Sequence, residues 1–217
     1  MIPLQFALRR RMMMAGGGGA PISELPLGAL INVGTDGGAG TPNYEIADKD
    51  NLVSGGVVLV RKNIYSLSMF NTTTVYPDGI LDNLMKTTIY NKMPQKLRNK
   101  MMDVSFQLYG PGDITRKMFA LTYTMVGFGS NHEVAEGKAL QLYTSNDIRI
   151  KLFNGVVHSW WLSSKSDPAY AYNVNGIGIS NLYGASGTIG AVPAFVIPSR
   201  TPYDSTLNTD GSYNLIL

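Results

Sequence analysis

Apolar positions in the first half of the globular part follow strand-like patterns. Tyr44 and Ile46 flank the polar Glu45, and an uninterrupted apolar run covers residues 57–60. Alternation is typical of a half-buried strand, whereas an unbroken run predicts a strand that is covered on both faces. The polar residues 48–51 lie between the two segments and predict a turn.

The spacing of apolar residues changes to that of a helix between residues 78 and 102. Apolar residues recur at three- and four-residue intervals behind Asp78, which we expect to be the N-cap. Pro94 predicts the end of this helix, because proline has no N–H to donate and clashes with the preceding turn. Residues 95–102 predict a short second helix.

The second half of the chain has weaker patterns. Residues 117–126 predict a further strand, residues 137–142 predict a helical turn, and residues 148–153 fit either element. After Val156 the chain is rich in Gly, Asn, Ser and Tyr, a composition typical of loops. The globular part is therefore predicted to mix strands, helices and long loops in a chain whose length suits one domain.

The first 19 residues differ in character from the rest and are predicted to form an arm with a joint. Residues 1–15 are apolar and basic, and residues 16–19 are glycines that give the chain conformational freedom. Either the arm is an anchor that docks into a neighbouring subunit, or it is a frayed terminus. The residues expected to form the anchor are Leu4, Phe6, Leu8, Arg9, Arg10 and Arg11. Residues 20–217 are predicted to form a single domain.

Charge and cysteine content argue against several functional classes. The formal net charge is +3, which Arg9 to Arg11 alone supply, so we expect a nearly neutral body without a general nucleic-acid surface. The absence of cysteine excludes disulfides, thiolate metal sites and cysteine nucleophiles. Apolar residues precede the arginines, which argues against a signal peptide, and no stretch approaches the ~20 apolar residues of a membrane span.

Two segments carry a resemblance to a known family. They are Trp160-Trp161-Leu162-Ser163-Ser164 and Ala191-Val192-Pro193-Ala194-Phe195-Val196-Ile197. They resemble the Trp-Trp-Leu-Arg-Ser and Gly-Val-Arg-Pro-Ala-Phe hallmarks of an uncharacterised C-type lectin-like domain family of bacteria and phages. That family is related in fold to formylglycine-generating enzymes and to the variable proteins of diversity-generating retroelements. The resemblance covers about residues 27–199, and its signature residues here are Trp160, Trp161, Leu162, Pro193 and Phe195.

The resemblance implies an α+β, C-type lectin-like fold with small antiparallel sheets, one or two helices and long irregular loops. Ser163 replaces the first arginine of the hallmark, and the second arginine has no counterpart, which implies altered anchoring of the loops. The cysteines on which formylglycine-generating activity depends are missing. Because neighbouring residues of a strand face opposite ways, we expect one of Trp160 and Trp161 in the core and the other at least partly exposed.

Motifs for catalysis and metal binding are incomplete. His132 and Glu133 are adjacent, but the second histidine that a zinc site of the His-Glu-x-x-His kind requires is missing. The other histidine, His158, is expected to be a packed or capping residue. Residues 48–51 lack the glycine and the distant glutamate of a calcium loop, and residues 184–187 miss the spacing of a nucleophile elbow. We therefore expect no enzymatic activity, no cofactor and no bound metal.

The segment 166–190 is the candidate ligand-binding surface. Its composition is like that of antibody binding loops, in which Tyr supplies rigid contact area and Asn and Ser supply hydrogen bonds. The candidate residues are Tyr170, Tyr172, Asn173, Asn175, Ser180, Asn181 and Tyr183. In the retroelement proteins that the chain resembles, this segment is the diversified ligand surface. The alternative is that these residues merely build irregular loops.

Two functions are compatible with these observations. The first is a phage or prophage virion structural or accessory protein, a lectin-like knob attached by its arm, such as a capsid decoration, collar or tail component. The second is a receptor- or carbohydrate-binding adhesin that uses residues 166–190. The expected partners are other virion proteins or further copies of the chain in a homo-oligomer, and a host surface receptor or glycan. The expected location is the virion, after synthesis in the bacterial cytoplasm.

Overall fold

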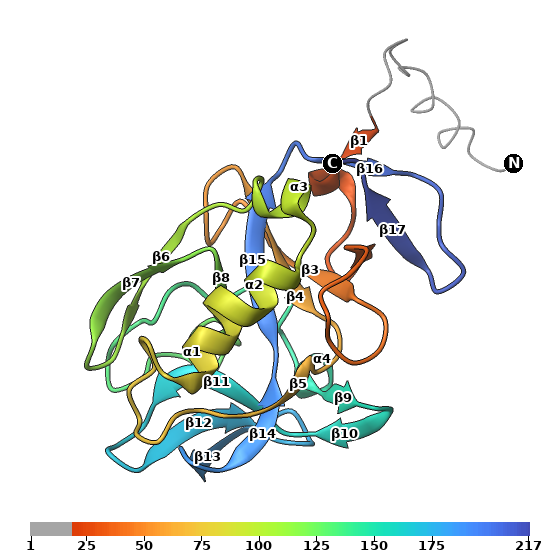
Figure 1. The fold of residues 1–217 in the computed structure, drawn as a ribbon. Helices are drawn as coiled ribbons and strands as arrows, with labels where there is room; N and C mark the ends of the chain where they lie inside the picture. Colours follow the sequence, from red (N-terminus) through yellow and green to blue (C-terminus); the bar gives the residue numbers. More distant parts are fainter. Residues whose placement is uncertain (1–18) are drawn as a thin grey trace, which may run out of the picture.

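A computed structural model describes residues 19–217 (Figure 1). The predicted anchor residues Leu4, Phe6, Leu8 and Arg9 to Arg11 lie outside the described residues. The described chain forms an eight-stranded sheet, a five-stranded sheet, two small hairpins and a helical segment. Strands and helices are mixed in this way in an α+β protein, and that class is confirmed.

The eight-stranded sheet contains both ends of the described chain. Its strands in spatial order are β1 (Ala20–Pro21), β16 (Pro202–Asp204), β17 (Ser212–Leu215), β2 (Leu30–Asn32), β3 (Asn43–Lys49), β4 (Gly56–Arg61), β15 (Pro193–Pro198) and β8 (Met118–Ala120). Neighbours are antiparallel except β17 and β2, which are parallel. The predicted strands on either side of the 48–51 turn are thus confirmed as β3 and β4. Every residue of β4 is buried, as its unbroken apolar run predicts.

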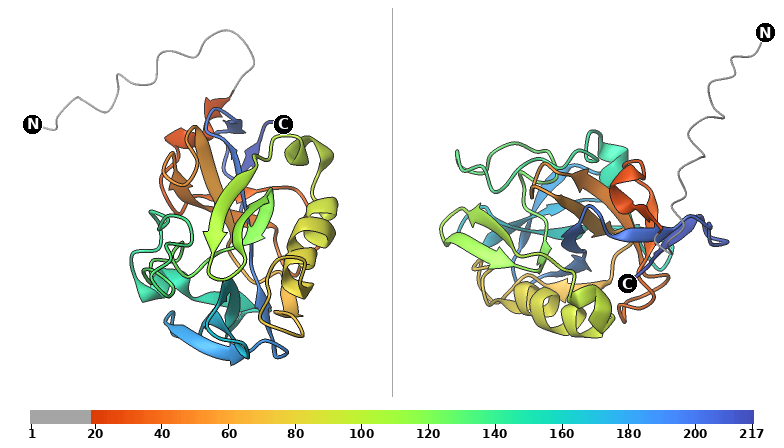
Figure 2. Two further views of the ribbon diagram at one scale, coloured as in Figure 1. Left: turned by 90° about the vertical axis from the view of Figure 1, so that its left-hand side faces the viewer. Right: turned by 90° about the horizontal axis from the view of Figure 1, so that it is seen from above.

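The five-stranded sheet lies at the other end of the molecule (Figures 1 and 2). Its strands in spatial order are β13 (Ser180–Gly184), β12 (Tyr170–Val174), β11 (Trp160–Lys165), β14 (Thr188–Ala191) and β5 (Ser66–Met69). The chain continues from β14 through Val192 into β15, so one extended segment joins the two sheets. Buried hydrophobic residues from both sheets belong to a single core cluster.

Two antiparallel hairpins complete the strands. They are β6 (Val104–Leu108) with β7 (Gly112–Arg116), and β9 (Lys151–Phe153) with β10 (Val156–His158). The second hairpin follows a short helix, α4 (Asn146–Arg149). The ambiguous segment 148–153 therefore contains the end of helix α4 and the whole of strand β9.

The predicted helix is confirmed, but its predicted N-cap is wrong. Helix α1 (Ile80–Asn83), the π-helical η2 (Leu84–Ile89) and α2 (Tyr90–Lys92) run without interruption, and after Pro94 comes α3 (Gln95–Arg98). Gly79 occupies the N-cap position and makes no side-chain capping bond. Asp78 adopts a left-handed conformation with φ of 62° and pairs with Lys86 instead. A further 3-10 helix, η1 (Ile22–Glu24), lies near the N-terminal end of the described chain.

The segment between β8 and α4 is irregular, and two predictions made for it are wrong. The strand predicted over 117–126 ends at Ala120, and residues 137–142 contain no helical turn. Apolar residues of this segment, such as Met125 and Leu140, are buried. Their spacing therefore reflects the anchors of a packed loop, and not the period of a helix or strand.

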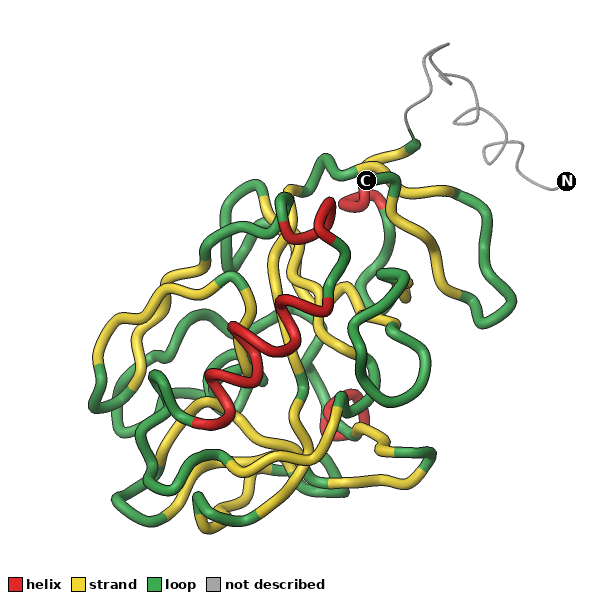
Figure 3. The backbone as a smooth tube through the Cα atoms, in the orientation of Figure 1, coloured by secondary structure: helices red, strands yellow, loops and turns green. Residues whose placement is uncertain are grey.

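The tube drawing in Figure 3 shows how this arrangement places the two ends of the molecule. The helical segment crosses the body and packs against β8 and β5. The described N-terminus and the C-terminus lie together at one end, and β12, β13 and the β9–β10 hairpin lie at the opposite end. We call these the terminal end and the distal end.

Candidate functional site

Both tryptophans of the signature are fully buried, which contradicts the prediction that one of them is exposed. The indole N–H of Trp160 donates to the Arg149 carbonyl at 2.9 Å, and that of Trp161 donates to the Ser68 carbonyl at 2.8 Å. Trp161 also meets the ring of Phe70 edge-on, with centroids 5.6 Å apart. The side chains do face opposite ways along β11, but chain from elsewhere in the fold covers both faces of that strand.

The two signature segments lie on either side of β8. Strand β15 pairs with β8, and the Ser163 N–H of β11 donates to the Leu121 carbonyl at 2.8 Å, directly after β8. Leu162 and Phe195 are fully buried, and Pro193 is buried. Segments about 30 residues apart in the sequence thus meet in the centre of the core.

The irregular segment after β8 is held by a buried carboxylate. Glu136 accepts hydrogen bonds from the Tyr109 N–H at 2.9 Å, from the Asn131 amide at 3.2 Å and from the Ser164 hydroxyl. Burial raises the pKa of Glu136, although these hydrogen bonds favour its charged form and oppose that shift. The hydroxyl of Ser163 is buried and has no hydrogen-bond partner among residues 19–217. The loop is therefore anchored next to the position where the resembling family has arginine.

Residues of the candidate ligand-binding surface 166–190 fall into exposed and structural groups. Tyr170, Asn181 and Tyr183 are exposed, with 47% of Tyr170 and 45% of Tyr183 accessible to solvent. Asn173 is buried and donates to the Asn181 carbonyl at 3.1 Å. The Asn175 side chain accepts from the N–H groups of the β12–β13 turn. Both asparagines therefore build the hairpin and do not extend from it.

The remaining two candidates are intermediate. Tyr172 is half-buried because its ring packs on Tyr123, with centroids 4.5 Å apart. Ser180 is also half-buried, at the start of β13. Three of the seven predicted residues thus present their side chains freely, on β12 and β13.

An exposed apolar set at the distal end was missed in the sequence. Its members, which we call the distal patch, are Val156, Val157, Ile177, Ile179 and Leu182, and they lie on the β9–β10 and β12–β13 hairpins. The hairpins adjoin, because a Cβ on Gly176 would lie 3.1 Å from a methyl group of Val157. Ile177 is 65% exposed and Val156 is 67% exposed. The sequence signal that could have indicated the β9–β10 hairpin is Asn154-Gly155, a residue pair typical of two-residue hairpin turns. In the structure both residues have positive φ angles, 50° and 82°.

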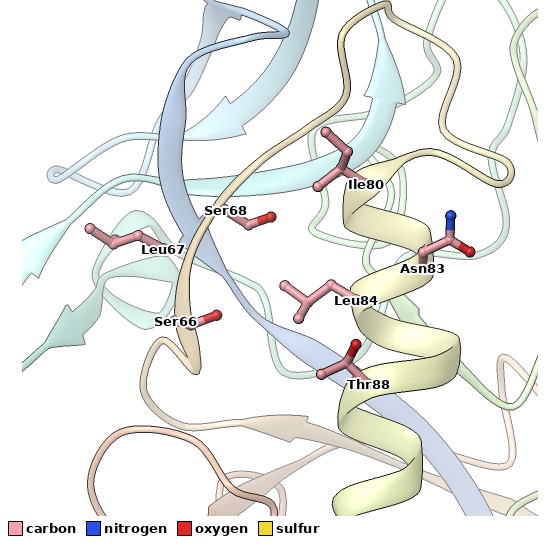
Figure 4. A pocket seen from close by; sticks show the side chains of 7 residues that line it. All are labelled: Ser66, Leu67, Ser68, Ile80, Asn83, Leu84 and Thr88. Atoms are coloured by element: carbon pink, nitrogen blue, oxygen red, sulfur yellow. The ribbon is translucent and has the colours of Figure 1, made fainter.

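A groove of about 420 Å³ runs between β5 and the helical segment. Its lining residues are Ser66, Leu67, Ser68, Ile80, Asn83, Leu84 and Thr88. Figure 4 shows Ser66 and Ser68 pointing from β5 toward the helix, from which Ile80 and Leu84 point back, whereas Leu67 points the opposite way. The lining carries no charged side chain and no residue of the 166–190 surface, so the sequence had not indicated it.

Comparison with known families matches residues 54–199 to a domain of unknown function, DUF6273. The chain belongs to this family. The matched range contains both signature segments, the groove and the two distal hairpins. No curated protein and no solved structure matches the chain.

Histidines of the DUF6273 domain make local structural contacts. The ring of His132 stacks on Tyr109 with centroids 4.3 Å apart, and its Nε2 lies 2.8 Å from the Ser166 carbonyl. His158 is half-buried, with Nδ1 2.9 Å from the Ser159 carbonyl. These contacts tie loops to the five-stranded sheet.

A carboxylate just before the matched range also serves the fold. Asp48 accepts the Leu52 N–H at 2.7 Å and the Gln141 N–H at 3.3 Å, which confirms the polar turn predicted at 48–51. Within residues 19–217 no three His, Asp or Glu side chains gather as a metal site would require. In the same residues, no helix is long and apolar enough to cross a membrane.

Proposed function

We propose that this chain is a structural or accessory protein of a phage particle, in which a C-type lectin-like knob is attached through its N-terminal arm. The observation that carries the proposal is the separation of the two ends of the molecule. The described chain begins at the terminal end, beside the C-terminus, while the exposed hairpins occupy the distal end (Figures 1 and 2). A body attached by its arm therefore presents the distal end outward.

The lectin-like part of the proposal is supported by the position of the signature residues. Trp160, Trp161, Leu162 and Phe195 are all fully buried, as residues that specify a core must be. The two segments that contain them both contact β8 or the residue directly after it. Segments that are separated in the sequence thus form one packed centre.

Removal of residues 2–18 tests the attachment role. The described body begins at residue 19 and contains the whole core cluster, so the truncated chain is expected to keep the melting temperature of the full chain. The truncated chain is expected to lose incorporation into particles, because ordering an arm costs entropy that a partner surface must offset. The measurement is antibody detection across a density gradient of lysate from the producing strain.

A matched control replaces residues 2–18 with a Gly-Ser segment of equal length, which keeps the added chain but removes its apolar and basic side chains. Both variants are expected to stay in the soluble fractions. Banding of either variant with particles at the level of the full chain would mean that the arm is not the anchor.

A second function, recognition of a host surface receptor or glycan, is favoured by the exposed side chains of the distal end. Tyr170, Asn181 and Tyr183 lie on the same β12–β13 hairpin as Ile177, Ile179 and Leu182 of the distal patch, and exposed aromatic and apolar residues are the groups that dominate binding interfaces. In this function the distal hairpins make the contact and the arm still supplies the attachment.

The double variant Tyr170→Ser with Ile177→Ser is expected to weaken binding of the protein to host cells at least tenfold, because each anchor residue typically contributes ~1–2 kcal/mol. Leu207→Ser is the matched control, since Leu207 is 55% exposed and lies outside the two hairpins. The melting temperatures of all three proteins are expected to agree. Equal cell binding by the double variant and the control would remove the recognition role.

A further inference from the structure

We propose that the open edge of β5 binds residues 2–8 from a second copy of this chain as an added strand. The inference rests on the proposed attachment role of the arm, and it names the surface that receives the arm. The groove between β5 and the helical segment would then hold every second side chain of the added strand.

Among the described residues, strand β5 has unpaired backbone at Leu67 on its outer side. It is an outer strand of the five-stranded sheet, and its strand neighbour is β14. Opposite Leu67 in the register lies Gly190, whose N–H donates to the Ser159 carbonyl and so points toward β11. Gly190 and Leu67 therefore form a non-hydrogen-bonded pair, which directs the N–H and C=O of Leu67 away from β14 and toward the open edge.

Strand β5 lacks three of the devices that protect natural edge strands from strand addition, which are charged side chains, proline and bulges. Other devices are a very short strand and cover by a helix or loop, and β5 is four residues long. The outer strand β1 of the larger sheet follows this rule, since it is two residues long and ends in Pro21. By contrast, β5 reads Ser-Leu-Ser-Met, pairs with β14 in regular register over all four residues, and has no charged side chain.

The groove fits the side chains of an added strand. A strand that pairs with β5 continues the pleat, so alternate side chains lie on the face to which Ser66 and Ser68 point, between β5 and the helix (Figure 4). Those two serines are small, and Ile80 is 39% exposed, so apolar area is open on the helix side. Successive inward side chains of a strand are about 6.7 Å apart. Ile80 and Leu84, one helical turn apart, are spaced by about 6 Å, so each can face one inward side chain.

Residues 2–8 have the pattern that this groove requires. Apolar side chains alternate with other residues at Ile2, Leu4, Phe6 and Leu8. An extended segment therefore presents all of them on one face. Pro3 is compatible with the outer strand of a sheet, where an N–H can be missing. The uncharged lining of the groove suits apolar side chains, and strand addition of this kind is an established mode of peptide recognition.

The occupant is inferred to come from a second copy because of where the arm begins. Gly19 and β1 lie at the terminal end, and the five-stranded sheet that contains β5 lies at the distal end (Figures 1 and 2). Eleven residues of chain lead from residue 8 to residue 19 and span at most ~36–40 Å when fully extended. To reach its own groove, this chain would have to run back along the body from the terminal end to the distal end. Exchange between copies does not require this, and it also generates the predicted homo-oligomer.

Disulfide trapping tests the inference, because the chain has no cysteine of its own. A chain with Ile80→Cys is mixed with a second, tagged chain that carries one arm cysteine at position 4, 5, 6, 7 or 8. After mild oxidation, the expected result is a linked heterodimer with one of Leu4→Cys, Phe6→Cys and Leu8→Cys, the position that faces Ile80, because inward side chains about 6.7 Å apart cannot all reach one cysteine. The yield with Gln5→Cys and Ala7→Cys is expected to be several-fold lower, since a strand turns those side chains to the other face.

Val75→Cys is the matched control for the groove position, because Val75 is 48% exposed but does not line the groove. Equal yields from Val75→Cys and Ile80→Cys, or equal yields from odd and even arm positions, would overturn the inference. A chain that carries Ile80→Cys together with the even arm cysteine of highest yield must form linked oligomers, and an internally linked monomer would overturn the assignment to a second copy. If trapping fails while removal of residues 2–18 still prevents incorporation into particles, the attachment role stands and the β5 site is wrong.

Discussion

Replacement of either Trp160 or Trp161 by alanine is expected to lower the free energy of unfolding by about 3–5 kcal/mol. Both side chains are fully buried, so each truncation leaves a large cavity at the centre of the core. Each also leaves a buried carbonyl without its indole donor, that of Arg149 or that of Ser68. The measurement is urea unfolding of each variant against the unmodified chain, followed by tryptophan fluorescence from the remaining indole and by circular dichroism.

Tyr183→Ala is the control for this prediction. Tyr183 lies 5.9 Å from the ring of Trp161 but is 45% exposed, so its loss is expected to cost much less than either tryptophan. A change of less than ~1 kcal/mol for one tryptophan, well below the usual cost of a buried Trp→Ala change, would show that this side chain is not enclosed as described.

Removal of the Asp36 carboxylate is expected to be similarly damaging, at about 3–5 kcal/mol, because it leaves a buried charge without its partner. Arg61 is fully buried, and its Nε donates to Asp36 at 2.6 Å. The hydroxyl of Tyr44 donates to the same carboxylate at 3.1 Å. Asp36→Ala therefore removes the acceptor of both the Arg61 guanidinium and the Tyr44 hydroxyl. Urea unfolding measures the resulting loss in the free energy of unfolding.

Asp78→Asn provides the control, since it breaks an exposed ion pair, between Asp78 and Lys86, and asparagine tolerates the positive φ of this position. The Asp78 carboxylate is 80% exposed, so water and salt screen the pair and no measurable change in stability is expected. The double variant Asp36→Ala with Arg61→Met removes both buried charges and is expected to recover part of the loss. Equal effects of Asp36→Ala and Asp78→Asn would show that burial does not distinguish the two pairs.

The sequence predicted those elements whose signals are local. The run at 57–60 predicted a strand buried on both faces, and the spacing behind residue 78 with Pro94 predicted a helix and its end. These patterns depend on the residues of one element alone. The N-cap could not be found in this way, because Asp78 forms an ion pair with Lys86 and the N-cap is Gly79.

The predictions that failed depend on what a segment packs against. Trp160 and Trp161 face opposite ways, but the carbonyls of Arg149 and Ser68, from distant parts of the chain, meet both indoles. Asn173 belongs to a segment whose composition is like that of a binding loop. It is nevertheless buried, because β12 lies between β11 and β13. Position within a sheet is set by tertiary pairing, which the period of a single strand does not reveal.

The pairing of β17 with β2 and of β1 with β16 gives the molecule a polarity that bears on engineering. Since both ends of the described chain lie in the same sheet, a protein fused to the C-terminus would emerge beside residue 19, where on the proposed function it would crowd the attachment of the arm. A reporter or an epitope intended for display belongs instead in a surface turn, such as Asn154-Gly155, where insertions are generally tolerated. The topology therefore favours the surface turns of the distal end, and not the two ends of the described chain, as sites for an inserted segment.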